Sequence, residues 1–273
     1  MRIDAHQHFW RYHPSRHSWI TEEMSVLKRD FLPEHLLPEL LEAKIDRSIA
    51  VQAVPSEDET LFLLDLCQAH PEVAGVVGWT ALASPEVERR LEFFSRFGPL
   101  RGFRHIAQSE PDDFFLVRPD FLRGISKLES FGFTYDILIY PRQLPAALEL
   151  VTRFPNQRFV IDHMAKPLIR SGEFDRWAAY MRKIAERENT FCKLSGLVTE
   201  ARWNRWRSSD FTPYLDLIFQ AFGTSRLMFG SDWPVCLLAA SYRQVHDLIA
   251  DYACSGQDRI FGENAARFYG LAT

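Results

Sequence analysis

Short apolar runs alternate with helix-like segments along the whole of this 273-residue chain, and this alternation limits the fold more than any other feature. Runs typical of buried strands occupy residues 3–10, 47–54, 73–82, 100–108, 133–140, 158–164, 190–197 and 226–234. Helical patterns lie between or after them at 33–45, 56–70, 84–98, 141–155, 173–188, 210–223, 241–253 and 262–271. The helix at 84–98 is expected to begin with Ser84 as its N-cap and Pro85 in its first position. No Gly/Ser-rich linker interrupts the series, so residues 1–273 are expected to form one domain.

Eight such strands in 273 residues predict an α/β fold, a single (β/α)8 TIM barrel with a C-terminal extra helix. A doubly wound open sheet is the alternative. We favour the barrel because strand number and chain length both agree with it, and because polar residues collect at the strand ends. In barrels of this kind the active site lies at the carboxyl ends of the strands.

The first of these strands carries an acid and two histidines at alternate positions. Residues 3–10 read IDAHQHFW, so Asp4, His6 and His8 would line one face of an extended strand. An isolated histidine is usually structural, but here the spacing and the position at a strand end favour a site. We therefore expect the two imidazoles to converge on one point.

Three further strand ends carry polar side chains. The fourth strand ends with Arg104 and His105, the sixth with His163, and the eighth with Asp232. Strand alternation would let only one of Asp162 and His163 face inward, and we favour His163. The same reasoning leaves Arg104 and His105 undecided. Asp232 before Trp233-Pro234 also fits an N-cap, although its place directly after an apolar strand favours a site.

Composition excludes several other classes of function. The net charge is only −4, and acidic and basic residues are interspersed. We therefore expect no nucleic-acid or membrane partner, and we expect the ligand to be a small molecule. The sequence shows no leader-like segment and no long apolar run, which predicts a cytoplasmic protein. We expect it to be a monomer or a homodimer. Its four cysteines, Cys67, Cys192, Cys236 and Cys254, form no CxxC pair and are expected to be reduced thiols.

Five motifs in order resemble one known family. DAHQHFW, GFRHIAQSEPDDFF, IDHMAKP, KLSGLVTEA and FGSDWPV together resemble the sugar-lactonase branch of the amidohydrolase superfamily, from Asp4 to Trp233. The HxH motif alone would be a weak signal, whereas five motifs at successive strand ends are a strong one. The resemblance implies hydrolysis of lactones such as those of L-fuconate or L-rhamnonate.

The departures from that superfamily concern its metals. Binuclear members carry a carboxylated lysine after strand four and a histidine after strand five, where this chain has Arg104-His105 and residues 135–140. The resemblance therefore implies at most one divalent ion, zinc by preference, on His6, His8 and Asp232, with His163 nearby. The resemblance also leaves a metal-free site open, and we expect any metal to be weakly bound and dispensable.

Opening a lactone requires an activated water, a group that stabilises the oxyanion, and an acid that protonates the leaving alkoxide. We expect Asp232 to act as general base and then acid, with Arg104, His163 or a metal stabilising the oxyanion. No GxSxG motif is present to support a serine hydrolase. Lys166 and Lys193 are expected to be ion-pair partners or groups that support the site from behind, rather than catalysts.

Hydroxyl-binding groups favour a sugar-derived lactone over a polyanion, which would need several arginines. The candidates for substrate binding are His105, Gln108, Glu110, Trp19 and Trp233. The long loop at 11–30 either shapes the pocket or only covers it. Two alternatives remain, namely a single-metal decarboxylase or amide hydrolase of the same superfamily, and a non-catalytic binding barrel.

Overall fold

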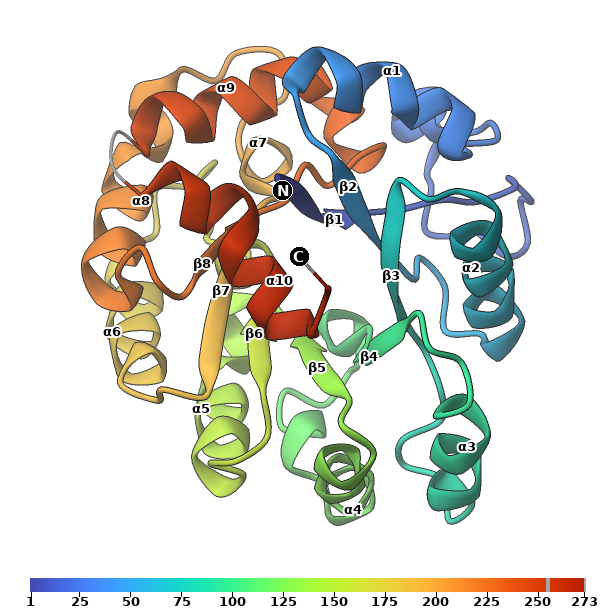
Figure 1. The fold of residues 1–273 in the computed structure, drawn as a ribbon. Coiled ribbons are helices and arrows are strands. Elements are labelled where there is room, and N and C mark those ends of the chain that lie inside the picture. Colours follow the sequence, from blue (N-terminus) through green and yellow to red (C-terminus); the bar gives the residue numbers. More distant parts are fainter. Residues whose placement is uncertain (254–255, 273) are drawn as a thin grey trace.

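The computed structural model describes residues 1–253 and 256–272. Eight parallel strands are hydrogen-bonded in chain order (Figure 1). They are β1 Ile3–Gln7, β2 Arg47–Val51, β3 Val73–Gly78, β4 Leu100–His105, β5 Thr134–Ile137, β6 Phe159–Ile161, β7 Thr190–Leu194 and β8 Leu227–Phe229. Each contains residues of one predicted run, because β-branched and aromatic side chains fit a pleated surface that is buried on both sides.

The sheet closes where β1 meets the chain that follows β8. The backbone N–H of His8 donates to the Trp233 carbonyl over 2.7 Å, and that of Asp232 donates to the His6 carbonyl over 2.8 Å. An open doubly wound sheet would leave both edges unpaired. The predicted (β/α)8 barrel is confirmed, and its seam runs through the motif that the sequence singled out.

Helices surround the barrel on its outer side (Figure 1). The longer ones are α1 Pro33–Ala43, α2 Glu57–Ala69, α3 Val87–Phe94, α4 Pro119–Leu128, α5 Leu144–Arg153, α6 Asp175–Ala185, α8 Ser208–Phe222 and α9 Tyr242–Tyr252. Short α7, Leu197–Glu200, follows β7. Amphipathic spacing explains their docking, since Trp177, Met181 and Ile184 of α6 are all buried.

The predicted start of α3 is wrong. Its first helical residue is Val87 and its N-cap is Glu86. The Ser84 hydroxyl instead accepts a hydrogen bond from the Glu86 backbone N–H over 3.1 Å. A serine can close a turn before a helix as readily as it caps the helix itself, so the residue type alone did not fix the boundary.

Helix α10, Asn264–Tyr269, covers the amino-terminal end of the barrel (Figure 1). Its Ala265, Ala266 and Phe268 pack against the barrel interior, in a buried cluster that also contains Ile3, Ile49, Val77, Val160 and Met228. The extra helix predicted from the sequence is therefore the floor of the barrel. Apolar contacts therefore fill the barrel interior at its amino-terminal end.

Other sequence expectations are met within the part of the chain that the structure describes. Cys67, Cys192 and Cys236 are buried free thiols, while Cys254 lies outside the described residues. None of the described helices has the length and apolar character that crossing a membrane requires.

Candidate active site

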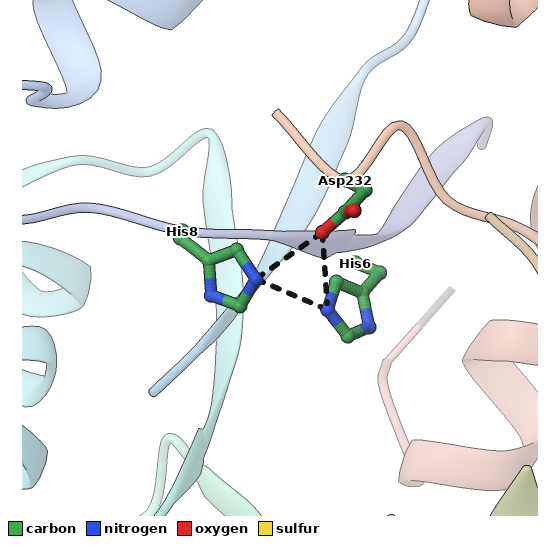
Figure 2. Close-up of side chains that lie close together, drawn as sticks. All are labelled: His6, His8 and Asp232. Carbon is green, nitrogen blue, oxygen red and sulfur yellow. Dashed lines mark hydrogen bonds and ion pairs between the residues drawn. The ribbon is translucent and has the colours of Figure 1, made fainter. Parts of the chain in front are cut away.

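Two histidines and one aspartate converge at the barrel seam (Figure 2). The Nε2 atoms of His6 and His8 are 3.2 Å apart, and Asp232 Oδ1 is 3.3 Å from His8 Nε2 and 3.8 Å from His6 Nε2. Extended backbone at β1 aims both imidazoles the same way. Asp232 adopts φ 57°, a left-handed conformation that aspartate tolerates better than most residues, and this bend turns its carboxylate toward the two rings.

His163 completes the cluster from the end of β6. Its Nε2 lies 3.9 Å from Asp232 Oδ1, and its Nδ1 lies 2.9 Å from the Ser195 hydroxyl. Gly196 makes room for the ring, because a Cβ at that position would lie 2.6 Å from His163 Nδ1. Ser195 was not identified from the sequence, since a serine after a strand is an ordinary loop residue.

Asp162 and His163 both face the site, so the expectation that only one of them could do so is wrong. Strand β6 ends at Ile161, and residues 163–166 all have positive φ between 49° and 57°. Strand alternation therefore stops before these residues. Asp162 is fully buried below the site and accepts a hydrogen bond from Arg104 Nη1 over 3.1 Å.

Arg104 points into the barrel and is 3% exposed. Its guanidinium donates to Asp162 and to the Gln52 carbonyl, and its Nη1 is 3.3 Å from His6 Nε2. His105 stands at the mouth. Both residues line the same cavity, and His105 is the last residue of β4.

A cavity of about 670 Å³ opens above this cluster at the carboxyl end of the barrel. His8, Arg104, His163 and Asp232 form its floor, and the walls include His105, Gln108, Glu110, Lys166, Trp19 and Trp203. His6 is fully buried behind the floor. Since Arg16, Ser18, Trp19 and Met24 also line the cavity, the 11–30 loop shapes it and does more than cover it.

Trp233 is not in this cavity, so its predicted place in the pocket is wrong. It is 2% exposed, and its ring packs at 5.2 Å from Phe31 and 6.2 Å from Phe9, measured between centroids. The left-handed backbone at Asp232 turns its own side chain toward the barrel axis and leaves the next residue, Trp233, directed at the loop. Trp233 is consequently part of the packing between barrel and loop.

His105 and Glu110 form a fixed pair on the cavity wall. The Trp79 indole N–H can only donate, so His105 Nδ1, 3.2 Å away, accepts from it. A neutral ring then carries its proton on Nε2, which lies 2.7 Å from Glu110 Oε1. Phe115 stacks on the ring at 4.6 Å. Both ring nitrogens are thus in use, and the remaining acceptor of the pair is the second oxygen of Glu110.

Burial sets the protonation of the floor. It holds the pKa values of His6 and His163 well below their usual value and also lowers that of His8. Burial raises the pKa of Asp232, but the neighbouring side chains, among them the positively charged Lys166, lower it by more. At neutral pH the floor is therefore a carboxylate among neutral imidazoles.

These groups can hold a divalent ion. Ligand atoms on a tetrahedral zinc are about 3.3 Å apart, close to the separations measured here. The Val51 carbonyl lies 2.7 Å from His8 Nδ1 and can only accept, so neutral His8 presents a lone pair at Nε2 to Asp232. Two lone-pair atoms facing each other favour a cation between them. His6, His8 and Asp232 form one candidate ligand set, and His6, Asp162 and His163 form another.

A family model described as amidohydrolase matches residues 3–271. This chain belongs to the amidohydrolase family. It is 43% identical to an L-fucono-1,5-lactonase of Burkholderia multivorans over 99% of this chain and 96% of that protein. It is 37% identical to an L-fucono-1,5-lactonase of Burkholderia ambifaria over 98% and 95%.

One solved amidohydrolase shares both sequence and fold with this chain. The crystal structure of an amidohydrolase from Burkholderia multivorans with bound zinc matches with a TM-score of 0.94 and 43% identity, over all of both chains. The resemblance drawn from five motifs is thus confirmed at the level of family. A divalent ion is therefore compatible with both the family and the donor atoms of this site.

Proposed function

We propose that this amidohydrolase opens a sugar-derived lactone to its aldonic acid. One observation carries the proposal, namely a buried Asp232 at the floor of a cavity, with its Oδ1 between 3.3 and 3.9 Å from the Nε2 atoms of three histidines. The names of relatives at 37–43% identity support the same reaction class. L-Fucono-1,5-lactone and related 1,5- or 1,4-lactones are the proposed substrates.

Asp232 takes a proton from water in the proposed reaction, and the water oxygen bonds to the lactone carbonyl carbon. The carbonyl oxygen becomes an oxyanion, which Arg104 and the Nε2–H of His163 stabilise. In this proposal the Ser195 hydroxyl, 2.9 Å from His163 Nδ1, donates to that nitrogen and leaves the ring proton on Nε2. When the ring carbon–oxygen bond breaks, Asp232 returns its proton to the departing oxygen.

His6, His8 and Asp232 would hold a single zinc ion. When bound, zinc supplies a Lewis acid for the carbonyl oxygen. We propose that such binding is weak and dispensable, because the Arg104 guanidinium lies 3.3 Å from His6 Nε2 and adds positive charge beside the ligands. The proposed general base is the same with or without the ion.

Glu110 and Gln108 are the proposed acceptors for ring hydroxyls, and Trp19 offers an aromatic face to the sugar. Gln108 Oε1 is buried and, among the described residues, has no hydrogen-bond partner. An unpaired acceptor in a cavity wall favours a ligand that can donate, as a polyol does. Arg104 is already paired with Asp162, which makes it a poor anchor for a dicarboxylate.

A panel of substrates tests this proposal. Proton release is followed with 1,5- and 1,4-lactones of L-fuconate, L-rhamnonate, D-galactonate and D-arabinonate, together with a simple amide, an aromatic carboxylate and a pyrone. Each is measured on protein stripped by chelator and on protein loaded with zinc. We expect turnover of a sugar lactone in both states. Turnover of only the amide or the aromatic acid, and only with metal, would instead establish an amide hydrolase or decarboxylase.

A further inference from the structure

A fully buried lysine lies below the proposed site and takes no part in the mechanism above. Lys193 of β7 is 0% exposed. Its ammonium donates to Asp136 and pairs with Asp162 Oδ1 at 3.0 Å. The Tyr269 hydroxyl of α10 also donates to Asp136, over 2.9 Å. Two buried carboxylates thus stabilise one buried cation directly beneath the histidines.

This ammonium also contacts His6. Lys193 Nζ is 3.1 Å from His6 Nδ1 and can only donate, so the contact requires a lone pair on Nδ1. Asp162 Oδ1, 3.4 Å from the same nitrogen, can only accept and would require a proton there. The two neighbours therefore favour opposite tautomers of His6, and Lys193 is the nearer one.

The other nitrogen of His6 points to the same tautomer. His8 Nε2, 3.2 Å from His6 Nε2, carries a lone pair because His8 Nδ1 donates to the Val51 carbonyl. It accepts only if His6 Nε2 carries the proton. Arg104 Nη1 opposes this with its second N–H at 3.3 Å, since its first donates to Asp162, but the His8 contact is the shorter of the two.

We propose that Lys193 is a positioning residue that holds the proton of His6 on Nε2 and thereby weakens metal binding at the His6–His8–Asp232 cluster. A metal ion needs the Nε2 lone pair. The proton must then move to Nδ1 and donate to Asp162, while Lys193 loses a hydrogen bond and is left with a like-charged ion nearby. Second-sphere groups of this kind alter metal affinity by roughly 10- to 100-fold.

Nitrogen NMR of 15N-histidine-labelled, metal-free protein reads the tautomer directly, with the His6 signals identified from their loss in His6→Gln. We expect Nε2–H in the native protein and a shift toward Nδ1–H in Lys193→Met, whose unbranched side chain is similar in length but cannot donate. Zinc affinity, measured by competition with a chromophoric chelator, should rise about tenfold or more in Lys193→Met.

Two further variants separate this role from general stability. Tyr269→Phe removes one hydrogen bond from Asp136 but leaves the Lys193–His6 contact, so the tautomer and the zinc affinity should stay as in the native protein. Lys193→Met with Asp136→Asn removes one buried charge of each sign. It should reproduce the higher zinc affinity even if the single variant fails to fold.

Nδ1–H in the native metal-free protein would overturn the proposal, as would unchanged or weaker zinc binding in the folded lysine variants. The metal effect rests on the ligand set used in the proposed function. Both measurements are made without substrate, however, so a failed lactone panel would leave the Lys193 proposal standing, and the reverse also holds.

Discussion

Among single residues, Asp232 combines ionisation with access to a cavity. Replacing it by asparagine keeps the shape of the side chain but removes the ability to accept a proton. We expect Asp232→Asn to lower kcat about a thousandfold, on the order of 4 kcal/mol in the barrier, as for loss of a general base. Steady-state kinetics with the lactone measure the loss of kcat, and circular dichroism checks that the variant is folded. Activity within about tenfold of native would rule out the assigned role.

Glu110 is the second residue whose role can be isolated. Its Oε1 is used by His105, so Glu110→Gln weakens the acceptor offered to a substrate hydroxyl and leaves the catalytic floor unchanged. We expect KM to rise about tenfold with kcat nearly constant, the scale of one hydrogen bond to a charged group. Glu88→Gln, on the exposed side of α3, is the matched control. A fall in kcat at constant KM would contradict the binding role.

At the scale of elements, α2 is tied to the end of β2 by one buried carboxylate. Glu59 accepts hydrogen bonds from the backbone N–H groups of Ala53 and Val54, which line the cavity. Burial raises the pKa of Glu59 from 4.5 to about 7, although these hydrogen bonds oppose the shift. The folded protein therefore binds a proton more tightly at Glu59 than the unfolded chain does.

The sign of the pH effect follows from this difference. Between the two pKa values the unfolded carboxyl loses its proton while the folded one keeps it, so the free energy of unfolding falls as pH rises from 4.5 to about 7. We expect Glu59→Gln to remove a contribution on the order of 3 kcal/mol from this decline. Urea unfolding of both proteins at about pH 5 and about pH 8 measures it. The assignment of Glu59 would be refuted if the free energy of unfolding fell equally between these two pH values in both proteins.

At the scale of the whole molecule, the barrel separates stability from chemistry at its two ends. Phe268 of α10 is 1% exposed in the floor, at the amino-terminal end of the barrel. Phe268→Ala should lower the free energy of unfolding by about 3–5 kcal/mol, the usual cost of emptying a buried phenylalanine site. Lactone turnover per folded molecule should be unchanged. Phe114→Ala, at a side chain 55% exposed, should change neither property.

The sequence by itself determined the architecture and the HxH pair. Strand and helix follow from the period of apolar side chains, a local property, and alternation within one strand aims His6 and His8 at the same point whatever the rest of the chain does. The barrel followed from the number and order of these elements. His163 and Asp232, which were also predicted to face the site, both line the cavity, and each lies within three residues of the end of an apolar strand.

Only the tertiary structure decided how the neighbouring residues face the site. Four successive non-glycine residues after β6 have left-handed backbone, which no local propensity predicts, and this places both Asp162 and His163 inward. Trp233 turned outward because Phe31 and Phe9 offered its ring a packed site. Charged residues within apolar strands, such as Asp136 and Lys193, indicate that each has a buried ion-pair partner. They do not indicate which residue that partner is. The contact of Lys193 with His6 joins residues 187 positions apart, so it exists only once the barrel has closed.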